Sequence, residues 1–336
     1  MSYIELKDIR KSFGDKEILH GINMNIEKGE FVTFLGSSGC GKTTLLRSII
    51  GLETIDSGTI MLDGKDITDT PPQQRGISMI FQQYCLFPTM DLYDNVSFGL
   101  RMRKTSKKEI DERVDEILSM VNMKEHIHKY PYQMSGGEQQ RAALARGLIM
   151  KPKVLLLDEP FSAVDAKLRK ELQLYLKNIH KTLDMTTVFV THDQEEAMRM
   201  SDTIHIFNSG VIEQHGSPCD IYANPNSIFV AGFIGSYNLF DRETSNRLFS
   251  IDSDIAIRPE LISISHEPFA EQDNCIYLEG TITGQIPQGS IIREIVQLTG
   301  GAEINVDTVF HNEMNYGDGD HVYIEIDRDD LVELSR

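Results

Sequence analysis

Residues 31–52 read FVTFLGSSGCGKTTLLRSIIGL and carry the strongest structural signal in the chain. The first six residues form an apolar run typical of a buried strand, and the last nine resemble the start of a helix. Between them, residues 36–43 fit the pattern G-x-x-x-x-G-K-[ST], a loop that binds phosphate between a strand and a helix. This stretch predicts an α/β domain with a mainly parallel sheet and a phosphate site at the strand's end.

The residue types in this loop suit an anion. Glycines let successive backbone N–H groups point at phosphates, and the N-terminal end of the next helix adds its positive dipole. Lys42 supplies charge to the β and γ phosphates, and Thr43 offers a hydroxyl to Mg²⁺. A glycine-rich turn without a ligand is the alternative, which the flanking strand and helix disfavour. The predicted nucleotide-binding residues here are Gly36, Ser37, Ser38, Gly39, Cys40, Gly41, Lys42, Thr43 and Thr44.

Residues 154–160, VLLLDEP, predict a second buried strand that ends in two carboxylates. An open α/β sheet places its ligand at the carboxyl ends of its strands. We therefore expect Asp158 to complete the surroundings of Mg²⁺ and Glu159 to polarise the attacking water. A strand that simply ends in solvent is the alternative for this pair taken alone.

A second anion site is predicted at residues 134–141, MSGGEQQR. A serine and two glycines at the start of a helix offer free N–H groups and a hydroxyl to an anion. The loop at 36–43 already encloses the phosphates of one nucleotide. The simplest interpretation is that the second site binds a nucleotide held by another copy of the chain. Its residues are Ser135, Gly136, Gly137 and Glu138.

With these motifs in this order, residues 3–235 resemble the ABC ATPase family. The resemblance implies ATP and Mg²⁺ as cofactors and a head-to-tail homodimer in which residues 135–139 contact the partner's γ-phosphate. It also implies that Phe13 stacks on adenine, that Asp165 in the loop 162–165 communicates between subunits, and that His192 contacts the γ-phosphate. Gln82 corresponds to the glutamine that senses Mg²⁺ and water. The implied catalytic residues are Glu159, His192, Lys42 and Gln82, and the implied metal site is Thr43, Gln82 and Asp158.

This sequence departs from the commonest family pattern at Glu138, where Gln is frequent, and at Met134 and Phe13, which replace Leu and Tyr. Because Glu138 adds a negative charge near a phosphate site, we expect a weaker contact with the partner's nucleotide. Cys40 lies inside the phosphate loop at a helix N-terminus, a setting in which thiols are often reactive. We expect alkylation of Cys40 to inhibit hydrolysis and ATP to protect against it.

The character of the chain changes near residue 240. Short alternating segments such as CIYLEGTIT and HVYIEI, separated by Gly, Asp, Asn and Pro, predict a small all-β domain, a barrel of the OB type. Residues 255–264 and the C-terminal segment resemble the transport-associated domain of importer ATPases. We therefore expect an ATPase domain at 1–238, with a helical subdomain at about 87–150, and a β-domain at 239–336.

Composition limits the partners of this chain. Residues 241–336 hold 20 Asp and Glu against 6 Arg and no Lys, within a net charge of −18 for the whole chain. An acidic surface repels nucleic acid and anionic lipid, so we expect neither as a direct ligand. No apolar run of transmembrane length and no secretion signal is found, and the four scattered cysteines suit a reducing compartment.

The resemblance implies the energy-coupling subunit of an importer, most similar to the polyamine (spermidine/putrescine) importer ATPases. Ferric-iron, phosphonate and sugar importers are the alternatives for the cargo. A soluble ABC protein acting on ribosomes or DNA is the alternative class, which the single cassette and the C-terminal domain disfavour. The implied partners are two membrane permease subunits and, indirectly, an extracytoplasmic solute-binding protein. The implied location is peripheral, on the cytoplasmic face of the inner membrane.

Overall fold

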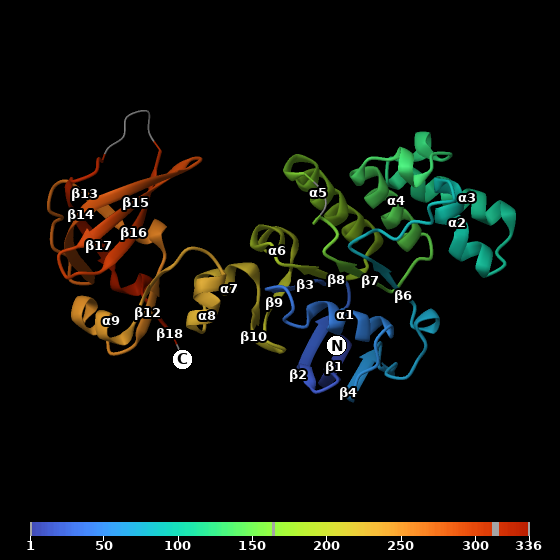
Figure 1. The fold of residues 1–336 in the computed structure, drawn as a ribbon, viewed down its shortest axis with the longest axis horizontal. Helices are drawn as coiled ribbons and strands as arrows, with labels where there is room; N and C mark the ends of the chain where they lie inside the picture. The colour runs from blue at the N-terminus through green and yellow to red at the C-terminus, as the bar shows by residue number, and fades with distance from the viewer. Residues whose placement is uncertain (1, 163–164, 311–315, 335–336) are drawn as a thin grey trace. The chain divides into compact units, whose positions relative to one another are not determined.

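The computed structural model describes residues 2–162, 165–310 and 316–334. They form two compact units, Met1–Pro218 and Cys219–Arg336 (Figure 1). The short helix α7 (Pro218–Ala223) begins where the units divide. The sequence placed the domain boundary later, at residue 238, and that boundary stays a prediction.

A mainly parallel sheet forms the centre of the first unit. Among the described residues its strand order is β10-β9-β3-β8-β7-β6, in which only the β9–β10 pair is antiparallel. β3, β7 and β8 are buried along their whole length, as expected for parallel strands covered on both faces. The predicted α/β fold is confirmed. The strands are β3 (Phe31–Gly36), β6 (Ile77–Ile80), β7 (Val154–Asp158), β8 (Thr186–Thr191), β9 (Thr203–Asn208) and β10 (Val211–Gly216).

A second, antiparallel sheet packs against one side of this centre. Its order is β2-β1-β4-β5, and its buried side chains share one core with α1 (Lys42–Ile50) and with β3, β7 and β8. The long hairpin β1–β2 brings Phe13 opposite Lys16 at its turn. This hairpin therefore places Phe13 at the end of a strand rather than in a loop. The strands are β1 (Ser2–Phe13), β2 (Lys16–Glu27), β4 (Ser57–Leu62) and β5 (Lys65–Asp66).

The remaining helices of the first unit cover the other side of the parallel sheet. Most begin at a side chain that accepts a backbone N–H, which fixes where each helix starts. α2, α3 and α4 gather beyond β6 and share a core with the parallel sheet. The helices are α2 (Leu92–Met102), α3 (Lys107–Met120), α4 (Gly136–Leu148), α5 (Ala166–Leu183) and α6 (Gln194–Met200), with single 3₁₀ turns at Pro72–Gln74, Lys124–His126 and Pro131–Gln133.

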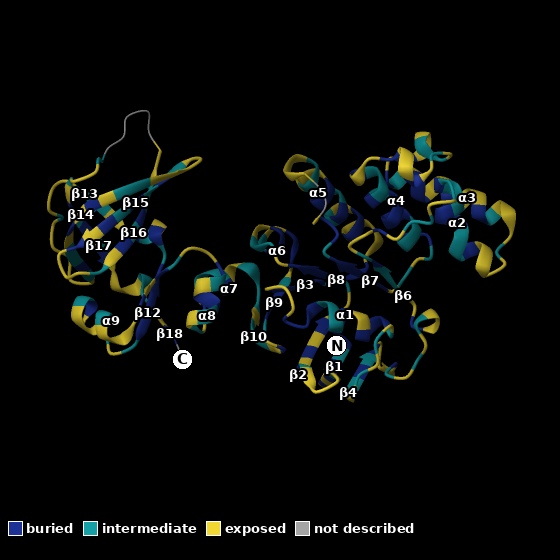
Figure 2. Cartoon of the chain, in the orientation of Figure 1, coloured by how far each residue is buried: buried dark blue, intermediate teal, exposed yellow. Residues whose placement is uncertain are grey.

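The second unit is built mainly from antiparallel strands, which confirms the predicted β-domain. Its two sheets have the orders β11-β12-β18 and β13-β17-β14-β15-β16 within the described residues. Alternate residues of β15 and β17 are buried in one core with residues of β12, so both sheets share that core (Figure 2). The strands are β11 (Asn238–Phe240), β12 (Asp254–Ile257), β13 (Ser263–Ser265), β14 (Cys275–Gln288), β15 (Ile291–Leu298), β16 (Glu303–Val309), β17 (His321–Asp327) and β18 (Val332–Leu334).

Helix α9 (Arg242–Phe249) was not predicted by the alternating pattern of this region. Asp241 caps it by accepting the N–H of Thr244 at 2.9 Å, and Phe249 packs edge-on against Phe240. Its sequence RETSNRLF has too few apolar residues to show a helical period. The unit also contains α8 (Ile228–Phe233) and 3₁₀ turns at Pro259–Leu261 and Arg328–Asp330.

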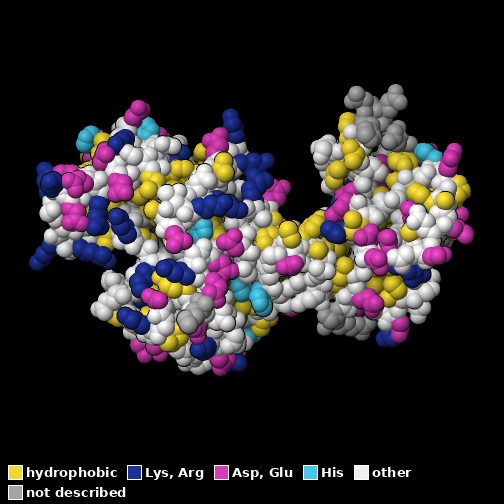
Figure 3. All heavy atoms as spheres, turned by 180° about the vertical axis from the view of Figure 1, so that it is seen from behind, with side chains coloured by type: hydrophobic (Ala, Val, Ile, Leu, Met, Phe, Trp, Pro, Cys, Tyr) yellow, Lys and Arg dark blue, Asp and Glu magenta, His cyan; other side chains and the backbone are white. Residues whose placement is uncertain are grey.

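Two surface properties bear on the partners of the chain. No helix in the described ranges is both long enough and apolar enough to cross a membrane. On the face shown in Figure 3, Asp and Glu side chains prevail on the second unit, whereas Lys and Arg gather on the first. This agrees with the excess of acidic residues after residue 240.

Candidate functional site

The phosphate loop turns sharply between β3 and α1. Gly41, at the N-cap of α1, has φ +105°, and a Cβ there would lie 2.9 Å from Leu19 Cδ2. Only glycine fits this combination of a left-handed backbone and a close neighbour. The turn leaves the first backbone N–H groups of α1 free of side-chain caps and available to an anion.

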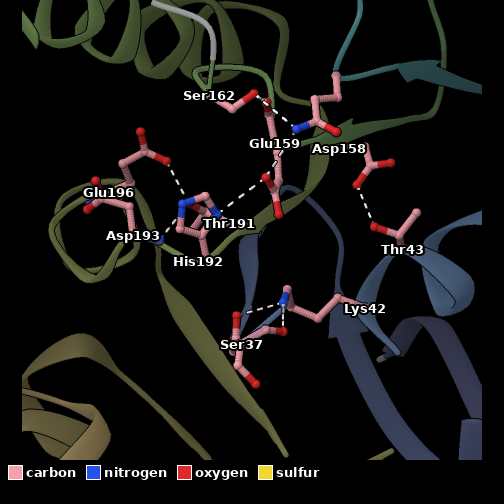
Figure 4. Close-up of polar contacts among 12 residues, drawn as sticks. Ser37, Lys42, Thr43, Asp158, Glu159, Ser162, Thr191, His192, Asp193 and Glu196 are labelled. Atoms are coloured by element: carbon pink, nitrogen blue, oxygen red, sulfur yellow. Dashed lines mark hydrogen bonds and ion pairs between the residues drawn. The ribbon is translucent and has the colours of Figure 1, made fainter. Parts of the chain in front are cut away.

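The Lys42 ammonium is held by its own loop. Its Nζ donates to the carbonyl oxygens of Gly36 at 2.6 Å and Ser37 at 2.7 Å, and lies 3.5 Å from Cys40 Sγ (Figure 4). Lys42 and Cys40 are both buried. A phosphate that reaches Lys42 must therefore exchange with these carbonyl contacts, and Cys40 lies within the same small space.

Thr43 and Asp158 join the loop to the central sheet. Thr43 Oγ1 donates to Asp158 Oδ1 at 2.8 Å, linking the start of α1 to the end of β7. Burial raises the pKa of Asp158, while the hydrogen bond from Thr43 lowers it. Oxygen atoms of this kind suit Mg²⁺, which binds through few protein ligands and completes its shell with water and substrate phosphates. No group of three or more His, Cys, Asp or Glu suited to a metal occurs in the described part of the chain.

Glu159 is placed by a strained backbone. Its φ is +43°, unusual for a residue with a side chain, and its N–H donates to Val190 O at 3.0 Å. The Glu159 Oε2 atom lies 3.3 Å from His192 Nδ1 and accepts a 3.4 Å hydrogen bond from Gln82 Nε2. Gln82 Nε2 also donates to Ser162 Oγ at 3.3 Å. Three segments distant in sequence therefore meet at one carboxylate (Figure 4).

A cavity of about 530 Å³ lies in front of Gln82 and Glu159, and His192 is not among the described residues that line it. It is lined by residues of the β1–β2 hairpin, the phosphate loop, Gln82 and Glu159. Phe13, at its rim, is 49% exposed, and Lys11 Nζ lies 5.0 Å from the centre of its ring. The lining residues are Phe13, Lys16, Ile18, Ser38, Gly39, Gly41, Lys42, Thr43, Thr44, Gln82 and Glu159.

The second predicted anion site lies at the N-terminus of α4. Ser135 is the N-cap, its Oγ accepts the N–H of Glu138 at 3.3 Å, and its own N–H donates to Glu138 Oε2 at 2.7 Å. At Gly137 a Cβ would lie 2.5 Å from Leu168 Cδ2, so a side chain there would force Leu168 to move. Ser135, Gly136, Gly137, Glu138 and Asp165 are not among the described residues that line the cavity.

The Glu138 carboxylate points back at its own helix. Its Oε1 lies 3.1 Å from His126 Nε2 and 3.4 Å from Lys129 Nζ. Hydrogen bonding from the Ser135 backbone lowers the pKa of Glu138, which is therefore ionised near neutral pH. The side chains of His126 and Lys129 therefore lie beside the negative charge of Glu138, the charge that we expected from the sequence to repel a phosphate.

The loop between β7 and α5 is described in part. Ala163 and Val164 lie outside the described residues. Asp165 is the N-cap of α5 and accepts the N–H groups of Lys167 and Leu168. Its side chain is therefore used for capping within this chain.

Sequence reasoning missed some residues of the site. Lys16 and Ile18 line the cavity. The segment KSFGDKEIL could have suggested them, because a tight turn after Phe13 places the following residues on the paired strand beside it. Thr191 and Glu196, on either side of His192 in sequence, form a buried hydrogen bond of 2.7 Å. No motif signals that contact, because it depends on where α6 begins.

A phosphate loop that faces a strained glutamate across a polar cavity is the arrangement of a P-loop ATPase. Residues 19–162 match the family model described as ABC transporter, and residues 255–334 match that of the TOBE domain. The chain belongs to the family of ABC transporter ATP-binding proteins, as the relatives below show. It is an ATPase coupled to transport and it binds ATP.

Relatives match both units. The spermidine/putrescine import ATP-binding protein PotA of Vibrio vulnificus is 42% identical over 333 residues, covering 92% of this chain and 88% of the relative. The protein of the same name from Pasteurella multocida is 53% identical over 245 residues, which cover 73% of this chain and 66% of the relative. Among solved structures, cbiO1 from Clostridium perfringens, part of the ABC transporter complex cbiONQ, matches with a TM-score of 0.63 at 31% identity, covering 66% of this chain and 92% of that one.

Proposed function

We propose that this chain hydrolyses ATP at the cavity between the phosphate loop and Glu159 to drive an ABC importer for polyamines. The observation that carries the catalytic part is the convergence of Gln82, Glu159 and His192 in front of the phosphate loop. The cargo rests on the relatives, whose names specify spermidine/putrescine import. Ferric iron, phosphonate and sugars remain the alternative cargoes.

In the proposed reaction each side chain has a distinct task. Phe13 stacks on the adenine, because its exposed ring lies at the rim of the cavity. Lys42 leaves its loop carbonyls for the β and γ phosphates, and Glu159 orients the attacking water. His192, together with Lys42, stabilises charge on the phosphoryl group as it is transferred. Gln82, which donates hydrogen bonds to Glu159 and Ser162, senses whether a nucleotide is bound.

Thr43, Gln82 and Asp158 would hold Mg²⁺ together with the phosphates of ATP. The pair Thr43–Asp158 supports this assignment, since both offer oxygen atoms at the entrance to α1. When bound, the ion neutralises phosphate charge.

The site is proposed to be completed by a second copy of the chain. Ser135 and Gly137 lie outside the cavity lining, although they present the N-terminus of a helix of the kind that binds phosphate. A head-to-tail homodimer would bring this helix to the partner's γ-phosphate. Bound ATP then holds the dimer closed, and ATP hydrolysis allows the two copies to separate.

The membrane partners are proposed to be two permease subunits, with a solute-binding protein acting on the far side. The chain would lie at the cytoplasmic face of the inner membrane as a peripheral subunit. The surface from Gln82 to Asn95 would pass motion to the permease, because Gln82 contacts Glu159 while Asn95 anchors the same segment through Phe87. The second unit is proposed to support the dimer, and its excess of acidic residues disfavours nucleic acid as a partner.

Purification of the tagged chain from gently solubilised native membranes tests this assignment. We expect a permease pair to be recovered, and in proteoliposomes we expect ATP turnover to rise with a solute-binding protein loaded with spermidine. Parallel assays with ferric iron, a phosphonate and maltose separate the alternative cargoes. Recovery of ribosomal or DNA-associated proteins without a permease would contradict the importer function.

A further inference from the structure

Glu196 is a buried carboxylate behind the candidate nucleotide site, and no task proposed above uses it. It lies on α6 and is only 5% exposed. Its Oε2 accepts a 2.7 Å hydrogen bond from Oγ1 of Thr191, the last residue of β8. A buried carboxylate is costly unless it is paired, so its contacts must offset that cost.

Thr191 extends this contact to both neighbours of His192. The same Thr191 hydroxyl accepts the backbone N–H of Asp193 at 3.0 Å, and Asp193 Oδ1 caps α6 by accepting the N–H of Glu196 at 3.1 Å. Figure 4 shows Glu196 and Asp193 on the opposite side of His192 from Glu159. Hydrogen bonds of Thr191 and of Asp193 therefore fix the turn on both sides of His192.

Arg169 connects this turn to α5. Its Nη1 lies 3.2 Å from Asp193 Oδ2 and its Nε lies 3.7 Å from Glu196 Oε1. The backbone N–H of Arg169 donates to Asp165 O at 2.9 Å. Arg169 thus lies one helical turn after Asp165, where the chain leaves the loop between β7 and α5.

The charges of this group compensate one another. Burial raises the pKa of Glu196, whereas the hydrogen bond from Thr191 and the attraction of Arg169 lower it. Removal of Arg169 would leave the buried Glu196 carboxylate without its cation and beside Asp193, whereas removal of Glu196 would leave the partly exposed Arg169 with its contact to Asp193. The pair therefore acts as one unit rather than as two independent contacts.

We propose that Glu196 and Arg169 are positioning residues that link the His192 turn to the first turn of α5. The inference rests on the proposed function, in which His192 acts at the γ-phosphate and a second copy of the chain completes the site. Displacement of the first turn of α5 moves Arg169, and Arg169 moves the His192 turn through Asp193 and Glu196. Closure of two subunits is thereby coupled to the placement of His192.

Thr191→Val and Thr191→Ser form the central test. Valine keeps the shape of the buried side chain but removes the hydroxyl, whereas serine retains it. With the full chain copurified with its membrane partners, we expect Thr191→Val to lower kcat roughly 10-fold with the KM for ATP unchanged. Thr191→Ser should restore the wild-type kcat.

Glu196→Gln and Arg169→Gln, alone and combined, test whether the two residues act as a unit. We expect each to lower kcat, and the double variant to lower it no further than the stronger single one. Asp307→Asn is the matched control, since it breaks the buried Arg293–Asp307 pair, with 2.8 Å between Arg293 Nε and Asp307 Oδ1, in the second unit. It should lower thermal stability without lowering kcat.

An unchanged kcat in Thr191→Val, or a raised KM with an unchanged kcat, would overturn the inference. If the Glu196 variants do not fold, the comparison of Thr191→Val with Thr191→Ser still tests the inference. Absence of ATP turnover by the wild-type complex would instead contradict the proposed function, so the two failures are distinguishable.

Discussion

Glu159 Oε2 lies 3.3 Å from His192 Nδ1, so two residues that follow neighbouring parallel strands meet at one point. Asp158 pairs with Val190 in the sheet, and Glu159 and His192 follow this pair by one and two residues. The contact holds the Glu159 carboxylate against His192. In the proposed reaction His192 turns to the γ-phosphate, which leaves the Glu159 carboxylate to accept a proton from water.

Glu159→Gln should therefore abolish turnover while leaving nucleotide binding intact. Glutamine keeps the size of the side chain but cannot take the charge that polarises water, and loss of such a group costs about 10²- to 10⁴-fold in rate. Phosphate release measures turnover, and equilibrium binding of labelled ATP measures affinity. Turnover comparable with that of the wild type would refute the role of Glu159.

Glu138→Gln and Glu138→Ala should differ. Glutamine can still accept the N–H of Ser135, whereas alanine loses a capping contact worth about 1 kcal/mol. Because His126 and Lys129 already lie beside the carboxylate, we expect Glu138→Gln to leave the KM for ATP unchanged and Glu138→Ala to raise it.

Ser106→Ala is a control for the loss of a helix cap, since the Ser106 hydroxyl caps α3 by accepting the N–H of Glu109 at 3.3 Å. It should not alter the KM for ATP. A lower KM in Glu138→Gln would instead support the expectation from sequence that the negative charge of Glu138 weakens the contact with the partner's nucleotide.

Alkylation of Cys40 by N-ethylmaleimide should inhibit hydrolysis slowly, with protection by ATP. The thiol is buried and lies 3.5 Å from Lys42 Nζ, so an added group would displace the lysine from the phosphate loop. Cys85 and Cys219 are exposed and Cys275 is partly exposed, so these thiols will also react, and a Cys85→Ala/Cys219→Ala/Cys275→Ala variant isolates the effect of Cys40. Inhibition that survives Cys40→Ala would show that another group is responsible.

Much of the fold was predictable because its signals are local. The apolar runs of β3, β7 and β8 predicted buried parallel strands, and the glycine pattern predicted the loop before α1. Helix α9 and the hairpin β1–β2 were not foreseen. α9 has a polar sequence and is helical because Asp241 caps it and Phe249 packs into the core of the second unit. β1 contains register shifts that obscure the alternation of its apolar and polar residues.

The candidate site was predictable as a set of residues but not as a set of contacts. The strand motif at residues 154–160 placed Glu159 at the edge of the sheet, whereas Gln82 and His192 came from the family resemblance. Their contacts depend on the left-handed φ of Glu159, which has no sequence signal, and on the start of α6, which Asp193 signals as an N-cap residue but which the motifs did not use. The assigned catalytic roles stay predictions that the variants above test.

His205 should make the first unit sensitive to acid. Its ring is buried on β9, stacks 5.2 Å from His215, and has no hydrogen-bond partner for either nitrogen among the described residues. Burial, together with the nearby His215, lowers the pKa of His205 from 6.5 to about 3. Between these values the unfolded chain binds a proton that the folded chain does not, so stability is retained above pH 6.5 and is lost as the pH falls below it.

Replacement by an uncharged ring of similar size tests this directly. We expect His205→Phe to remove an acid destabilisation of about 1.4 kcal/mol at about pH 5.5, measured as the free energy of unfolding in urea titrations relative to about pH 7.5. His128→Phe, at a side chain that is 84% exposed, controls for the added ring. If wild type and His205→Phe lose the same stability over this range, His205 does not take up the proton on unfolding, and other groups must account for any acid sensitivity.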